Sequence, residues 1–170
     1  MELTTREFWG LVHGLLLGGL FLVAFAGGLA GLYSLKPGLL TESGVAERMR
    51  RLIAGTTTMA AVAWATVITG TWVVYPWYRE DEATSPRSTL LASPDTDEWH
   101  KFAMEWKEHV AWIAPMLATA VAVMVVYYRQ DLIRNHTARR IAMGLFIAAF
   151  VTAAIAGILG ALITKKAPIT

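Results

Sequence analysis

Long apolar runs separated by short polar segments dominate this chain. Four stretches consist mainly of apolar residues, at positions 8–35, 52–78, 106–129 and 140–164. Each is at least as long as the roughly 20 residues that a helix needs to cross about 30 Å of hydrocarbon. The pattern therefore predicts an all-α membrane protein, a four-transmembrane-helix bundle with up-down-up-down order.

The segments between these stretches leave no room for a second folded unit. The first and third connections are short, and the second is an acidic loop at residues 79–100. We therefore expect a single membrane domain over residues 1–170. Within its third helix, Pro115 has no N–H to give to the preceding turn, so we expect the helix to be interrupted there.

Composition supports a membrane protein and narrows the chemistry that it can perform. Hydrophobic residues make up 55% of the chain and charged residues 16%, and the mean hydropathy is +0.46. This is more apolar than an ordinary soluble domain. A formal net charge of only +2 gives no reason to expect nucleic-acid binding. The absence of cysteine from the sequence excludes iron–sulfur clusters, thiolate-bound haem and covalent c-type haem.

Arginine is concentrated in the two short connections. Its positions there are Arg48, Arg50, Arg51, Arg129, Arg134, Arg139 and Arg140. Basic residues in short loops favour the cytoplasmic side of a membrane, and acidic residues contribute little to orientation. We therefore expect a multi-pass protein of the bacterial inner membrane, with both termini and the acidic loop outside.

Two of the histidines fall within the apolar stretches, and ionisable groups there commonly mark functional sites. His13 and His109 lie at similar distances from Tyr33 and Tyr128, which end their helices about 30 Å away at 1.5 Å per residue. The first and third helices of such a bundle run in the same direction, so both imidazoles should lie at one level. His100 and His136 fall outside the stretches, and we expect them to be solvated.

Two imidazoles at one level of a bundle can bind an iron porphyrin from both faces. We therefore predict one haem b with His13 and His109 as its iron ligands. Around it we expect small residues beside His13, aromatic walls beside His109 and cations for the propionates. These residues are Gly10, Gly14, Trp106, Trp112, Arg6, Arg79 and Lys107.

This arrangement resembles the general class of four-helix membrane cytochrome b subunits that anchor larger oxidoreductases. The resemblance implies an electron-transfer subunit with membrane or redox partners, rather than an enzyme acting alone. Such a subunit would relay electrons between the quinone pool or a membrane partner and an external carrier such as a soluble cytochrome. If a quinol is oxidised at this level, Glu105, Glu108 and Tyr75 are candidates to accept its protons.

Two other functions fit the same sequence. A cofactor-free accessory subunit of a larger membrane complex would use its glycine-rich helix faces for packing and its histidines for hydrogen bonds between helices. A pigment-binding subunit would use histidine to bind chlorophyll magnesium. A cytochrome carries a visible chromophore and a cofactor-free accessory subunit does not, so the colour of the purified protein distinguishes these two functions.

Overall fold

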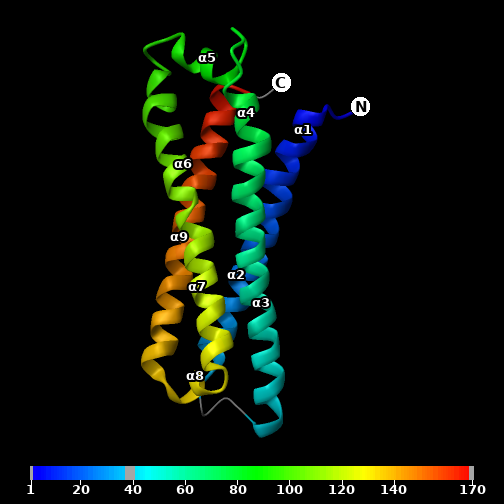
Figure 1. The fold of residues 1–170 in the computed structure, drawn as a ribbon, viewed down its shortest axis with the longest axis vertical. Coiled ribbons are helices and arrows are strands. Elements are labelled where there is room, and N and C mark those ends of the chain that lie inside the picture. Colours follow the sequence, from blue (N-terminus) through cyan, green and yellow to red (C-terminus); the bar gives the residue numbers. More distant parts are fainter. Residues whose placement is uncertain (1, 37–40, 169–170) are drawn as a thin grey trace.

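The computed structural model of the chain describes residues 2–36 and 41–168. All regular structure in this part of the chain is helical, as predicted. Four helices are long and apolar enough to cross a membrane: Thr5–Ser34, Gly44–Tyr78, Trp99–Tyr128 and His136–Lys166. They lie side by side along one axis, and the first and last described residues are at the same end (Figure 1).

The first and fourth helices begin in polar residues ahead of their apolar runs. The first consists of α1 (Thr5–Gly10), the π-helical segment η1 (Leu11–Leu16) and α2 (Leu17–Ser34). Thr4 caps it, because its hydroxyl accepts the Glu7 N–H while the Glu7 carboxylate accepts the Thr4 N–H at 2.8 Å. The fourth helix is α9 (His136–Lys166), whose Ala138 N–H donates to the Asn135 side chain. Such caps satisfy N–H groups that a helix leaves free, so the helices extend beyond the apolar residues.

The second and third helices are also built from several segments. The second contains α3 (Glu42–Thr69), η3 (Gly70–Val74) and α4 (Tyr75–Tyr78), and the third contains η4 (Trp99–Met104), α6 (Glu105–Ala111) and α7 (Ile113–Tyr128). Trp112 separates α6 from α7, which confirms the interruption predicted from Pro115. The short helices α5 (Pro86–Leu91) and α8 (Asp131–Arg134) lie at opposite ends of the bundle (Figure 1).

Close packing around Phe146 forms the main core. This fully buried ring lies 5.4 Å from the Phe25 ring, centroid to centroid, and its edge lies directly over Gly28. Both α2 and α7 pack against α3 and α9. The first and third helices therefore lie diagonally across the bundle from each other.

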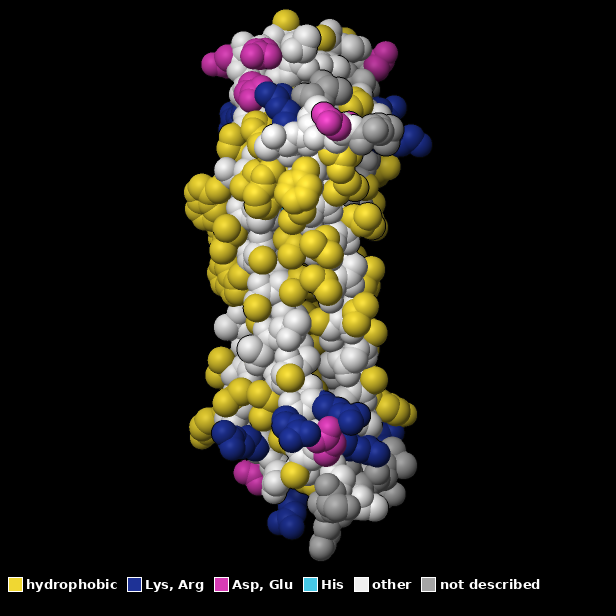
Figure 2. Space-filling model, turned by 90° about the vertical axis from the view of Figure 1, so that its right-hand side faces the viewer, with side chains coloured by type: hydrophobic (Ala, Val, Ile, Leu, Met, Phe, Trp, Pro, Cys, Tyr) yellow, Lys and Arg dark blue, Asp and Glu magenta, His cyan; other side chains and the backbone are white. Residues whose placement is uncertain are grey.

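Exposed apolar side chains cover much of the middle of the face shown in Figure 2, and charged side chains gather at both of its ends. We call this region the apolar band. Val23 is 73% exposed and Leu15 is 71% exposed, although both lie deep within the first apolar helix. A soluble monomer does not leave so much contiguous apolar surface in water. The four helices are therefore compatible with a multi-pass membrane protein.

Candidate functional site

Three π-helical segments gather at the end of the bundle that carries α5. They are η1, η3 and η4, and they belong to three different helices. A π-turn contains one residue more than an α-turn and is frequent at functional sites. Polar and titratable side chains at this end form what we call the polar cluster, which consists of His13, Thr69, Tyr75, Tyr78, Arg79, His100, Lys107 and Glu108.

His13 lies in η1 and points toward the second helix. Its Nδ1 is 3.1 Å from the Thr69 hydroxyl oxygen, and that hydroxyl donates its own hydrogen to the Ala65 carbonyl at 2.8 Å. With its hydrogen on the Ala65 carbonyl, the Thr69 oxygen accepts a hydrogen bond from the His13 tautomer that is protonated at Nδ1. In the neutral ring this places the free lone pair on Nε2, the form in which an imidazole binds a metal.

A glycine on the second helix allows this approach of the His13 ring. A Cβ built at Gly70 would lie 2.8 Å from His13 Cε1 and 3.4 Å from Nε2. Any larger residue at position 70 would therefore displace the ring. Gly70 was not among the residues predicted from the sequence, because its importance depends on which helix packs beside His13.

His109 lies on the outer face of α6. The residue is exposed, and its Nδ1–H donates to the Glu105 carbonyl of the same helix at 2.6 Å, which leaves the Nε2 lone pair free. Lys107 is two residues earlier and therefore about 200° around the helix. Its side chain crosses Gly160 of α9, where a built Cβ would lie 2.9 Å from Lys107 Cε, and its charge is close enough to act on His13. The side chain of α6 that faces His13 is thus Lys107 rather than His109.

The small and aromatic residues predicted to surround a haem do not enclose a common space. Gly10 and Gly14 are exposed, and no atom lies within 4 Å of a Cβ built at either position. Trp106 is exposed and stacks on Phe102, with ring centroids 6.2 Å apart. Trp112 is half-buried and belongs to a group of tryptophans between the second and third helices.

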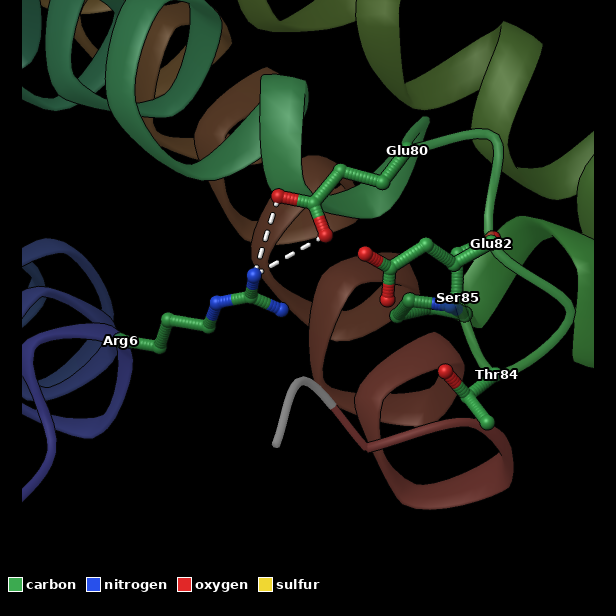
Figure 3. A pocket seen from close by; sticks show the side chains of 6 residues that line it. Arg6, Glu80, Glu82, Thr84 and Ser85 are labelled. Atoms are coloured by element: carbon green, nitrogen blue, oxygen red, sulfur yellow. Dashed lines mark hydrogen bonds and ion pairs between the residues drawn. The ribbon is translucent and has the colours of Figure 1, made fainter.

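The two arginines predicted near the propionates already bind protein groups. Arg6 forms an ion pair with Glu80 at 2.9 Å. The pair stands at the edge of a polar pocket of about 220 Å³ under the acidic loop (Figure 3). Arg79 donates to the Tyr75 hydroxyl at 2.8 Å, and this bond raises the already high pKa of Arg79. Both cations are therefore already engaged by protein groups, and Arg6 joins the first helix to the start of the acidic loop.

Two further parts of the polar cluster lie beside Arg79. Tyr78 and His100 are buried and hydrogen-bonded, with 2.8 Å between the tyrosine hydroxyl and His100 Nδ1. The expectation that His100 would be solvated is therefore wrong, because η4 turns it inward against Tyr78. Glu108 lies against Tyr75, and among the described residues its Oε1 is buried without a hydrogen-bond partner.

Taken together, titratable groups extend from the exposed end into the bundle. Arg79, Tyr75 and Glu108 lead toward Lys107 and His13. The tyrosine, glutamate, lysine and histidine side chains of this row are groups that can accept or release protons, whereas Arg79 stays protonated. The part of the chain that the structure describes contains no cluster of three or more His, Asp or Glu arranged to hold a metal ion.

Comparison with known proteins does not connect the chain to a family. No protein-family model matches it, and no curated protein and no solved structure shows significant similarity to it.

Proposed function

We propose that the four helices cross a membrane in alternating directions, with the polar cluster and both termini on the outer side. The exposed apolar band supports insertion, since lipid is the solvent that such a surface requires. Arg48, Arg50 and Arg51 lie at the opposite end, beside the arginines near α8, and this distribution favours a cytoplasmic location for that end.

Within this arrangement we propose a b-type cytochrome subunit that carries one haem b at His13. The observation that carries the proposal is the hydrogen bond between His13 Nδ1 and the Thr69 hydroxyl, which leaves the Nε2 lone pair free when Nδ1 carries the proton. Metal-binding histidines are held in this way by a partner on the second ring nitrogen. A haem supplies a one-electron couple, which suits relay between a quinol or membrane partner and an external carrier.

His109 is the proposed second ligand, and this role requires a rearrangement. α6 is a seven-residue segment bounded by the π-helical η4 on one side and by the break at Trp112 on the other. Turning this segment by about 200° would exchange Lys107 for His109 on the inner face. The proposal therefore predicts that haem binding moves Lys107 out of the bundle. Glu108 and Tyr75 would accept protons if the electron donor is a quinol.

An absorption spectrum of the detergent-purified protein, oxidised and then reduced with dithionite, tests this proposal. We expect a reduced b-type spectrum, with haem b identified after pyridine extraction. The spectrum should be lost in both His13→Ala and His109→Ala but retained in His136→Ala, a matched control at the exposed start of α9. A colourless folded protein isolated from its native membrane, or normal haem content in His109→Ala, would contradict the bis-histidine site.

A cofactor-free accessory subunit is the second candidate, and the position of Lys107 favours it. Its methylene groups cover Gly160 and its charge reaches His13, so the chain itself supplies groups to the interior at this level. In that case His13→Ala and Lys107→Met should change the stability of the protein or its assembly with partners. The purified protein should show no absorption band at wavelengths longer than those of its aromatic residues.

A further inference from the structure

A groove opens at the arginine-rich end of the bundle, far from the polar cluster. It lies between the start of α3 and the end of α7 and encloses about 590 Å³. Its floor includes Met49, which is buried, and Ile53, while Tyr128, Arg50 and Arg129 line its sides. One cavity thus combines an apolar floor with cationic and aromatic walls.

The two arginines stand at the height where lipid headgroups would be. Arg50 lies two residues before the apolar run of the second helix, and Arg129 immediately follows α7 of the third helix. Basic side chains gather at this end of the molecule, below the apolar band (Figure 2). Basic pockets between membrane helices on the cytoplasmic side bind anionic headgroups, and tyrosine favours the same interface.

We propose that this groove binds an anionic phospholipid with a hydroxyl-bearing headgroup, of the phosphatidylglycerol type. Arg50 and Arg129 bind the phosphate, and an acyl chain lies over Met49 and Ile53. Asp131, which also lines the groove, accepts hydrogen bonds from the headgroup hydroxyls. Two arginines against one aspartate leave the groove with a net positive lining, which matches one phosphate.

Arg129 is held at the groove in a backbone conformation that side chains rarely adopt. Its φ is 44° and its ψ is −122°, and it is the only non-glycine residue with positive φ among those described. Its Nε donates to the Val126 carbonyl at 3.3 Å, and within the described residues its terminal nitrogens have no hydrogen-bond partner. Unusual backbone conformations cluster at ligand sites, where the ligand contact offsets their cost. Glycine would suit this position better, so the presence of arginine supports a role for its charge.

Arg50 is positioned by its own helix. Its guanidinium pairs with Glu47, whose second carboxylate oxygen binds Arg51 Nε at 2.6 Å. A guanidinium has five N–H donors, so pairing with Glu47 leaves donors for a phosphate.

This inference rests on the proposed position of the bundle in a membrane and is independent of the haem. Native mass spectrometry of the full chain in detergent tests it, with phosphatidylglycerol, phosphatidylethanolamine, phosphatidylcholine or inorganic phosphate as the probe. We expect one phosphatidylglycerol to remain bound in preference to the other lipids. Extraction of cell membranes with alkali, carried out separately, reports insertion, so a failure of the membrane proposal is distinguishable from a failure of the site.

Three variants make the test specific. Arg50→Gln and Arg129→Gly should each weaken phosphatidylglycerol binding about fivefold, and together about thirtyfold, from the usual contribution of one basic residue at an anionic surface. Arg140→Gln removes the same charge from an exposed position at this end outside the groove and should leave binding unchanged. Arg129→Gly should not lower thermal stability, which separates lost binding from lost folding.

Three results would overturn the site. Equal retention of phosphatidylcholine or phosphatidylethanolamine would show that the groove does not select an anionic headgroup. An equal loss of binding in Arg140→Gln would indicate attraction to the whole arginine-rich end. Displacement of the lipid by millimolar inorganic phosphate would identify a free anion as the ligand.

Discussion

Replacing Gly70 with alanine should displace His13. The added methyl group would lie 2.8 Å from His13 Cε1, whereas carbon atoms in comfortable contact are about 3.5–4.0 Å apart. The ring must therefore move by roughly 0.7 Å or more, which strains its bond to Thr69. Overpacking of this kind costs about 1–3 kcal/mol, and the better helix propensity of alanine returns about 0.5–1 kcal/mol.

Gly14→Ala is the matched control, because no atom lies within 4 Å of a Cβ at that position. Both variants gain the same helix propensity, so the difference between them isolates the clash, at about 1–3 kcal/mol. The free energy of unfolding can be measured in mixed micelles by titration with dodecyl sulfate, followed by tryptophan fluorescence. If His13 binds a haem, the haem content of Gly70→Ala should fall as well.

Making Gly70→Ala in a His13→Ala protein tests whether the added methyl group clashes with the His13 ring. In His13→Ala the space beside position 70 is empty, so Gly70→Ala should then be neutral or stabilising. The same penalty in both backgrounds would refute the packing of His13 on Gly70, as would equal unfolding free energies for Gly70→Ala and Gly14→Ala.

Two other substitutions probe the packing of the bundle. Gly28→Ala should be about 1–3 kcal/mol less stable than Gly27→Ala in the same titration, because a Cβ at Gly28 lies 2.6 Å from Phe146 Cζ, whereas no atom lies within 4 Å of one at Gly27. Equal stability would refute that contact. Arg139→Met should lower the free energy of unfolding by at least about 2 kcal/mol, since the buried guanidinium donates to three backbone carbonyls near the ends of neighbouring helices. An unchanged midpoint of thermal unfolding would show that water satisfies these carbonyls when the guanidinium is absent.

The four long helices could be predicted because their apolar runs exceed the thickness of a bilayer, and the break near Pro115 because proline lacks an N–H. Neither argument shows which face of a helix turns inward. In a helix that is apolar on all sides, hydrophobic periodicity gives little indication of the buried face. The sequence therefore indicated that His109 was unusual without indicating that Lys107, two residues away, would face His13.

The pairing of Tyr78 with His100 was missed for a related reason. His100 precedes the apolar run of its helix, and a residue in such a polar segment is usually solvated. Its burial depends on η4 and on the position of the second helix, and a π-turn has no simple sequence signal. The same holds for Gly70, whose role became visible only when the first and second helices were seen together.

The π-helical segment η1 holds one residue more than an α-helical turn over nearly the same rotation. Deleting one residue between Leu11 and Leu16 would therefore restore ordinary α-helical bonding without the shift of register that a deletion causes in most helix interiors. Arg6 would stay beside Glu80, and the helix beyond the segment would keep its packing. Only residues inside the segment, His13 among them, would change their positions. One codon lost or gained here is therefore a route by which related chains could reposition His13 while keeping the rest of the bundle unchanged.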